Sequence, residues 1–336
     1  MKAECLYFNA PYQVSIKSEP IEALNEDQVL IETYQSAISA GTELLLYRGD
    51  FPKDIPVDQH IRPLNVNFRY PLKYGYCLIG KVVDRGRQVD PYWNNRYVFA
   101  FHPHATHFTC TPDDLIPIPN SVPTKLGVLF PSMETALALV MDGAPMVGEC
   151  VVVFGQGVIG LLTCELLARF PLQTLLTIDR YKLRREISCA LGAQASFDPE
   201  DLNSINEMSP KGTDLSFELS GSPKALNQAI NITGYSGRVI IGSWYGTKRI
   251  ELELGGHFHR SHISLISSQV STISPGIRGR WDKQRRYALA WDLLIDSQAS
   301  PLITQYIPFH KAEDAYQMLD QHPESAIQIV FSYSAS

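Results

Sequence analysis

The chain has 336 residues, 45% of them apolar and 10% aromatic, and a formal net charge of -6 at pH 7. This length suits two domains better than one, and a mildly acidic chain without a long basic run is not expected to bind nucleic acid. No run reaches the apolar length of a membrane span and residues 1–4 begin no secretory signal, so we expect no membrane partner.

The six cysteines are scattered along the chain and form no Cys-x-x-Cys pair. This spacing provides neither a zinc ribbon nor a disulfide framework. We therefore expect a reducing, cytoplasmic environment.

The first part of the chain, residues 1–125, has many short β-like runs interrupted by Pro, Gly and Asn. Examples are residues 29–34, 78–83 and 96–101. This pattern predicts a partly closed antiparallel β domain.

The most specific motif is a Val-Val-Val-Phe run followed by Gly-Gln-Gly-Val-Ile-Gly, which leads into a helical pattern. In that context G-x-G-x-x-G predicts a dinucleotide-binding βαβ unit. Gly155 permits a tight turn, Gly157 lets the backbone approach a pyrophosphate, and Gly160 allows close packing of helix and strand. The pyrophosphate is expected at the start of the new helix, beside Val158 and Ile159.

An acidic residue, Asp179, ends the second strand of this unit, about 20 residues beyond the glycines. A carboxylate there binds the ribose hydroxyls and repels a 2′-phosphate, which predicts NAD(H) in preference to NADP(H). The basic residues Arg180, Lys182, Arg184 and Arg185 keep the alternative open. We expect Arg180 to stack on the adenine and the others to form a solvated helix face.

Residues 126–270 alternate strands with helices and form the predicted NAD-binding Rossmann domain. Ser220 and Gly242, which each follow a strand, are expected beside the adenosine ribose. Thr135, near the start of the helix entering this domain, is expected to bind the cofactor near the nicotinamide. Its neighbour Glu134 is interpreted as a favourable charge in the first turn of that helix. The alternative is that Glu134 acts as a base or orients the nicotinamide.

Residues 271–336 are predicted to return to the first domain and complete it, with helices around 287–295 and 312–319 and a final strand at 327–331. A β domain wrapped around a Rossmann unit leaves a cleft in which a small-molecule substrate would meet the nicotinamide.

This order of motifs resembles the medium-chain dehydrogenase/reductase superfamily, which contains the zinc-type alcohol dehydrogenases. The Ala-Gly-Thr-Glu motif at 40–43 and the segment 74–80 carry the resemblance together with the Rossmann unit, and they are most similar to the branch of bacteriochlorophyllide hydroxyethyl dehydrogenases. The resemblance implies an α/β fold in which a doubly wound Rossmann sheet is inserted in a GroES-like, partly closed β-barrel catalytic domain. It also implies a homodimer.

The departures from the family concern its metal. Zinc-dependent members have a Cys ligand where this chain has Ala40 and a His ligand where it has Tyr76, and their nearby acid is replaced by Cys77. Pro131 lies in the region of the third ligand, and the lobe with four close cysteines is missing. Since a catalytic zinc needs about three protein ligands, we predict neither a catalytic nor a structural zinc.

Without a metal, the protein must itself supply hydrogen-bond donors and a proton to a developing alkoxide. Tyr76 is the first candidate, with Lys73 or the nicotinamide charge lowering its pKa; the alternative is that its ring fills the vacated pocket. Thr42 matches the hydroxyl that relays protons in zinc members, or else caps its turn. His104 is expected to donate a proton or to orient the substrate.

Three histidines lie close together in the sequence, at His102, His104 and His107. A metal bound by this group, with Cys110 as a further ligand, is the less favoured alternative because no third ligand is firmly indicated.

The function predicted from the sequence is that of a zinc-independent NAD(H)-dependent oxidoreductase, which interconverts a secondary alcohol and a ketone by hydride transfer. Two alternatives stay open at this point. They are an NADPH-dependent quinone or enone reductase and a non-catalytic nucleotide-binding relative.

Overall fold

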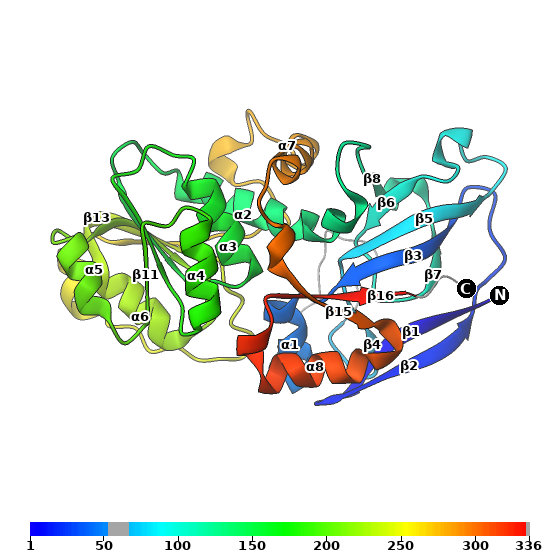
Figure 1. Cartoon of the computed structure of the whole chain (residues 1–336), viewed down its shortest axis with the longest axis horizontal. Helices are drawn as coiled ribbons and strands as arrows, with labels where there is room; N and C mark the ends of the chain where they lie inside the picture. The colour runs from blue at the N-terminus through cyan, green and yellow to red at the C-terminus, as the bar shows by residue number, and fades with distance from the viewer. Residues whose placement is uncertain (53–66, 334–336) are drawn as a thin grey trace. The chain divides into compact units, whose positions relative to one another are not determined.

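The computed structural model describes residues 1–52 and 67–333 (Figure 1). The chain divides into two compact units, Met1–Pro131 with Ala299–Ser336, and Ser132–Gln298. The second unit therefore continues to Gln298 instead of ending at residue 270. The reason is that helix α7 (Lys283–Ile295) belongs to it, anchored by the pairing of Arg286 with Glu134.

The first unit is built from antiparallel β-structure. Among its described residues, one sheet has three strands in the order β2-β1-β4 and a second has seven, β15-β16-β3-β5-β6-β8 with β7 also paired to β3. Only β15 and β16 pair in parallel. The strands are β1 (Lys2–Ala10), β2 (Gln13–Pro20), β3 (Val29–Ala37), β4 (Leu72–Lys73), β5 (Leu78–Arg85), β6 (Tyr97–Ala100), β7 (His107–Cys110), β8 (Leu115–Pro117), β15 (Ile303–Pro308) and β16 (Gln328–Ser332).

The predicted strands at 29–34, 78–83 and 96–101 are confirmed as β3, β5 and β6. The final predicted strand is β16, which returns to the first unit and pairs with β3, as expected.

Two helices of this unit position the candidate site. Helix α1 (Ala40–Arg48) was not expected in a β domain; it begins after Ser39 and ends at Gly49, whose φ of 83° suits a residue without a side chain. Helix α8 (Ala312–Gln321) packs on it, and Arg48 Nε donates to Asp320 Oδ1 at 2.6 Å.

The second unit, which the structure describes throughout, contains a six-stranded parallel sheet in the order β11-β10-β9-β12-β13-β14. Counted from β9 this order is 3-2-1-4-5-6, that of a Rossmann fold. The strands are β9 (Cys150–Phe154), β10 (Thr174–Ile178), β11 (Ala195–Phe197), β12 (Thr213–Glu218), β13 (Thr233–Ile241) and β14 (Ser264–Ser267). The helices are α2 (Phe130–Gly143), α3 (Val158–Leu167), α4 (Lys182–Ala190), α5 (Leu202–Met208), α6 (Pro223–Ile232) and α7.

The apolar pattern explains this sheet. All five residues of β9 are buried, as in a strand covered on both faces. Val152 and Phe154, which point to one face, join a core cluster with Leu226 and Ile230 of α6. The fold class predicted from the sequence is confirmed.

Within residues 1–52 and 67–333, one helical stretch, Thr124–Gly143, is long and apolar enough to cross a membrane, and 78% of its apolar window is buried inside the structure. Such burial is typical of a core helix.

Candidate cofactor site and hydroxyl cluster

The glycine motif lies at the carboxyl end of β9, where a Rossmann fold binds its ligand. Gly155 has a φ of 90°, and a Cβ there would lie 2.7 Å from the backbone of Ser220. A Cβ on Gly160 would lie 1.9 Å from the Gly155 carbonyl oxygen, so this position requires glycine. A Cβ on Gly157, in contrast, would meet nothing within 4 Å.

This opening fits a pyrophosphate. Gly157 precedes α3, no side chain caps this helix, and the space beside the Gly157 Cα is open, so the first amide groups of α3 have no side-chain cap and remain available to a ligand. Val158 and Ile159, the first two residues of α3, are partly exposed. The second unit can therefore hold a dinucleotide at the positions that the sequence predicts.

Asp179 follows β10 and is 8% exposed. Its Oδ2 accepts a hydrogen bond from the Gln156 amide at 2.7 Å and its Oδ1 accepts one from the Tyr181 amide at 2.8 Å. The carboxylate is thereby fixed beside the glycine turn, and each oxygen keeps a second lone pair for a ribose hydroxyl. Arg180 is exposed, with its guanidinium carbon 4.8 Å from the centre of the Tyr181 ring.

The other predicted cofactor residues lie in the same unit. Ser220 donates its hydroxyl to the buried Glu218 carboxylate at 2.5 Å, at the carboxyl end of β12. Gly242 follows β13, and a Cβ there would lie 2.5 Å from the Leu139 side chain, so packing explains this glycine. Thr135 lies in α2 and is partly buried.

A cluster of three hydroxyl groups lies in the first unit, at the start of α1. The Tyr76 hydroxyl hydrogen-bonds with the hydroxyls of Ser39 and Thr42. All three residues are half-buried. The structure thus brings together two of the residues that the sequence singles out, Tyr76 and Thr42.

Burial raises the pKa of Tyr76 to about 12, although the hydrogen bonds from Ser39 and Thr42 oppose this effect. The expectation that Lys73 lowers this pKa is wrong, because the Lys73 ammonium pairs instead with Glu19 at 2.9 Å. Tyr76 therefore carries its proton throughout the neutral range and can act as a proton donor.

A buried network lies behind the hydroxyl cluster. Glu43 and His104 are both 0% exposed, and His104 Nε2 lies 3.1 Å from Glu43 Oε2. Glu43 Oε1 accepts from the Ser39 amide at 2.7 Å, and the Tyr316 hydroxyl donates to Glu43 Oε2 at 2.5 Å. His104 Nδ1 lies 2.7 Å from the hydroxyl of Ser36 on β3.

The same histidine supports the segment that carries Tyr76. A Cβ on Gly75 would lie 2.6 Å from the His104 ring, and the His104 amide donates to the Tyr74 carbonyl at 3.2 Å. The geometry does not favour the expected role of His104 as a proton donor to substrate. Its two ring nitrogens contact Ser36 and Glu43, and its side chain is not exposed to solvent. Its contacts are those of a positioning residue.

The neighbouring histidines do not join it. His102 stacks on Phe108 at 3.8 Å, its Nδ1 lies 2.8 Å from the Pro103 carbonyl oxygen, and burial lowers its pKa to about 4. His107 lies in β7, where it pairs with Glu32 of β3. Within residues 1–52 and 67–333, no three His, Cys, Asp or Glu side chains gather as a metal site.

The side chains at the family's zinc positions do not fit a zinc ion. Ala40 and Pro131 carry no ligand atom, and the Tyr76 hydroxyl bonds with Ser39 and Thr42. The Cys77 thiol donates to the Val128 carbonyl at 2.8 Å, and burial raises its pKa, which keeps it from the thiolate form that zinc requires.

Sequence reasoning missed Ser39, Ser36 and the role of Glu43. Glu43 lies in the motif at 40–43, yet its partner His104 is 61 residues away, and only the fold reveals the pair. A signal was present in Ser39, because serine is a residue type that commonly precedes a helix.

Comparisons with known proteins agree with this architecture. Residues 158–285 match a family model described as zinc-binding dehydrogenase. The D-guloside 3-dehydrogenase of Escherichia coli K12 is 23% identical over 347 residues, which cover 96% of this chain and 98% of that protein. An alcohol dehydrogenase of Escherichia coli CFT073, complexed with NADH, superposes with a TM-score of 0.80 at 16% identity, covering 98% of this chain and 99% of that one. These similarities agree with the resemblance to the medium-chain dehydrogenase/reductase superfamily, and the fold is the one that these solved structures have.

Members of this superfamily differ in their cofactor. A protein of Sinorhizobium meliloti 1021 bound to NADP superposes with a TM-score of 0.79 at 18% identity, covering 99% of both chains. The matched segment 158–285 lies within the second unit and contains none of the positions aligned with zinc ligands. Both neighbours bind a nicotinamide cofactor, and neither comparison bears on the side chains at the positions aligned with zinc ligands.

Proposed function

We propose that this protein is a zinc-independent, NAD(H)-dependent oxidoreductase that interconverts a secondary alcohol and a ketone. The observation that carries the proposal is the Tyr76 phenol, which is bonded to two hydroxyls where the family has a metal ligand. The glycine motif and Asp179 support a nicotinamide dinucleotide in the second unit.

A bound nicotinamide supplies or takes up the hydride in this reaction. During reduction the carbonyl oxygen gains negative charge, and the Tyr76 hydroxyl donates its proton to that oxygen. Ser39 and Thr42 then donate hydrogen bonds to the Tyr76 oxygen, which disperses its charge. A pKa near 12 keeps Tyr76 protonated before this step, and an alkoxide is a strong enough base to accept the proton.

The substrate that we favour is a ring secondary alcohol of a sugar derivative. The D-guloside 3-dehydrogenase is aligned over almost the whole of both chains, which supports this class. Hydroxyl groups at the candidate site suit a polar substrate with several hydroxyls of its own.

The cofactor preference is tested at Asp179. Asp179→Ser removes the charge that repels a 2′-phosphate, so the ratio of kcat/KM for NAD(H) over NADP(H) should fall at least about tenfold. Glu207→Ser is the matched control, because Glu207 is an exposed acid on α5 of the same unit. An unchanged ratio in Asp179→Ser would assign the preference to the neighbouring arginines.

The reaction class is tested by turnover. Chelator-treated protein is incubated with NAD+ or NADP+ and a panel of glycosides, polyols and simple secondary alcohols, and reduced cofactor is followed by absorbance. NADH formation with a glycoside or polyol supports the proposal. Reduction of quinones or enones by NADPH alone, or tight NADH binding without any turnover, would replace it with one of the two alternatives.

The proposal extends to the quaternary structure and the cellular location of the protein. We propose a cytoplasmic homodimer with a small-molecule substrate and neither a nucleic-acid nor a membrane partner. The unit-2 sheet ends at β14, whose outer edge has no further strand in this fully described unit, and an unpaired edge favours pairing with a second copy.

A further inference from the structure

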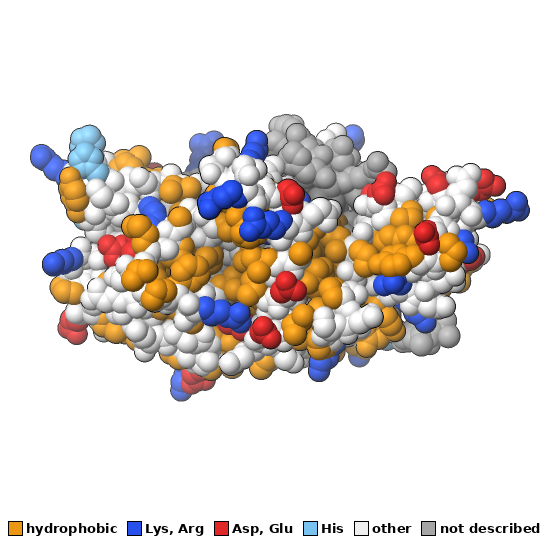
Figure 2. All heavy atoms as spheres, turned by 90° about the horizontal axis from the view of Figure 1, so that it is seen from above, with side chains coloured by type: hydrophobic (Ala, Val, Ile, Leu, Met, Phe, Trp, Pro, Cys, Tyr) orange, Lys and Arg blue, Asp and Glu red, His pale blue; other side chains and the backbone are white. Residues whose placement is uncertain are grey.

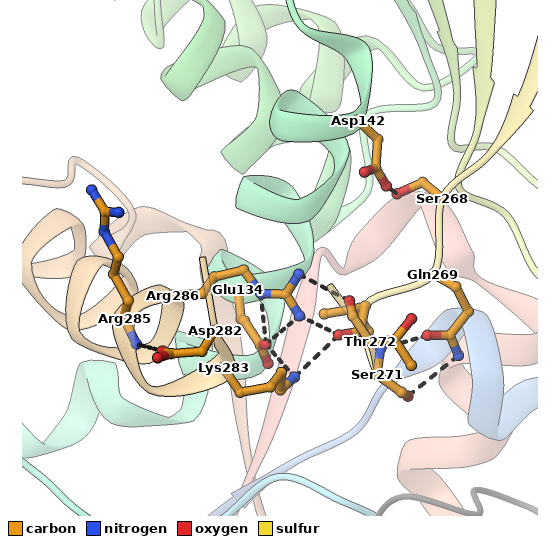
Figure 3. Close-up of polar contacts among 11 residues, drawn as sticks. Glu134, Asp142, Ser268, Gln269, Ser271, Thr272, Asp282, Lys283, Arg285 and Arg286 are labelled. Carbon is orange, nitrogen blue, oxygen red and sulfur yellow. Dashed lines mark hydrogen bonds and ion pairs between the residues drawn. The ribbon is translucent and has the colours of Figure 1, made fainter. Parts of the chain in front are cut away.

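A buried ion-pair cluster joins two helices of the second unit (Figure 3). Arg286 on α7 donates from Nε and Nη2 to Glu134 Oε1 on α2, at 3.0 and 2.8 Å. Lys283, one turn earlier on α7, donates to the same oxygen at 2.5 Å. Arg286 and Glu134 are each only 2% exposed, so Glu134 forms a buried ion pair in addition to any effect on the helix dipole.

The exposure of Arg286 sets it apart from its neighbours. Arg278, Arg280 and Arg285, which lie close to Arg286 in the sequence, are exposed. Helix α7 lies at the top of Figure 1, and Figure 2, which is seen from above, shows Lys and Arg side chains on that face. A guanidinium is removed from water only at considerable cost unless it is paired and hydrogen-bonded. Arg286 is therefore not one of the solvated residues of the helix surface, and its burial depends on the ion pair with Glu134.

The donors that remain hold the segment that follows β14. Arg286 Nη1 donates to the Thr272 carbonyl at 3.3 Å, and Arg286 Nη2 also donates to the Val270 carbonyl. Lys283 donates to the same Val270 carbonyl at 3.1 Å. Nearby, Ser268 donates its hydroxyl to Asp142 of α2 at 2.6 Å. We call residues 268–272 the post-β14 loop; its backbone carbonyls are tied to α7 and its first side chain to α2.

The sheet order gives the location of this loop relative to a dinucleotide. Asp179 follows β10 and Gly157 follows β9, so the adenosine ribose and the pyrophosphate belong over these strands. A Rossmann sheet binds the two mononucleotide halves on either side of its switch point, at the carboxyl ends of the strands. The nicotinamide half therefore belongs on the side of β12, β13 and β14, and the post-β14 loop begins at the carboxyl end of β14.

We propose that Glu134, Lys283 and Arg286 form a positioning cluster that fixes the post-β14 loop for the nicotinamide half of the cofactor. This inference rests on the proposed nicotinamide-dependent function. Glu134 holds the two cations on one oxygen, and the cations hold the loop carbonyls. The loop is thereby ordered before the cofactor binds, which reduces the entropy cost of binding.

Two ligands distinguish the positioning of the post-β14 loop from general support of the fold. NADH has both halves, whereas ADP-ribose has the adenosine, the pyrophosphate and a ribose but no nicotinamide ring. We would measure the Kd of each by calorimetry for the full-length wild type, Arg286→Lys, Glu134→Gln and Lys283→Met. Arg169→Met is the matched control, because Arg169 is also a paired cation of this unit, 3.6 Å from Glu165, and it makes no contact with the post-β14 loop among the hydrogen bonds of Val270 and Thr272 described above.

We expect Arg286→Lys and Glu134→Gln to weaken NADH binding at least about tenfold, with ADP-ribose binding changed less than about twofold. Lys283→Met keeps the Arg286 pair and should show a smaller shift in the same direction. Equal losses for the two ligands, or unchanged NADH affinity in all three variants, would overturn the positioning role. A wild type that binds neither ligand would instead overturn the proposed function itself.

Discussion

Replacing Tyr76 with Phe should lower kcat for ketone reduction at least about a hundredfold while leaving the NADH affinity unchanged. The substitution removes the hydroxyl that bonds with Ser39 and Thr42 and leaves the ring that fills the pocket. Because burial raises the pKa of Tyr76 to about 12, the wild-type group stays protonated from pH 6 to 9. Its titration should therefore add no pH dependence to kcat in that interval.

Tyr97→Phe, which alters an exposed tyrosine on β6 of the same unit, is the control and should keep normal kinetics. Near-normal kcat in Tyr76→Phe would leave Tyr76 as a pocket-filling side chain. A fall in apparent kcat that disappears when NADH is raised would point to cofactor binding instead of proton transfer.

Glu43→Gln should lower the free energy of unfolding by about 3 kcal/mol and also lower kcat, since the carboxylate is fully buried and serves three groups. It accepts from the Ser39 amide and the Tyr316 hydroxyl and lies 3.1 Å from His104 Nε2. An amide keeps one acceptor oxygen and offers a donor in place of the other, so at least one buried partner loses its hydrogen bond. Urea denaturation and steady-state kinetics measure the two effects.

The control for this variant is Asp320→Asn, which weakens the partly exposed pair of Asp320 with Arg48 and should cost less than about 1 kcal/mol. Glu43→Asp, which keeps the charge, should recover part of kcat if Glu43 acts by positioning Ser39 and Tyr76. Loss of stability with normal kcat would mean that the network only supports the fold.

Local patterns predicted those parts of the structure that local interactions determine. The β-branched run at β9, the glycine motif and the acid after β10 follow each other within one βαβ unit, so residue order alone indicated their positions. The short β-like runs interrupted by Pro, Gly and Asn predicted the β domain, and the final apolar run predicted the return of β16 to it.

The parts of the candidate site that could not be predicted depend on contacts between residues far apart in the sequence. His104 reaches Glu43 across 61 positions, and Glu134 is paired with Arg286 across 152. From the sequence, Glu43 was interpreted as part of the motif at 40–43 and Glu134 as a first-turn charge. No periodicity in the sequence connects either acid with its partner. The prediction that Lys73 lowers the pKa of Tyr76 was wrong for the same reason, because the pairing of Lys73 with Glu19 depends on the fold.

The central claim, a dehydrogenase that works without zinc, is tested most directly by metal analysis of protein purified without chelator, with NADH titrated into the same sample. We expect less than about a tenth of an equivalent of zinc, saturable NADH binding, and turnover that survives treatment with chelator. About one equivalent of zinc, with turnover lost on its removal and restored on its return, would contradict it, and the role given to Tyr76 would then pass to the metal.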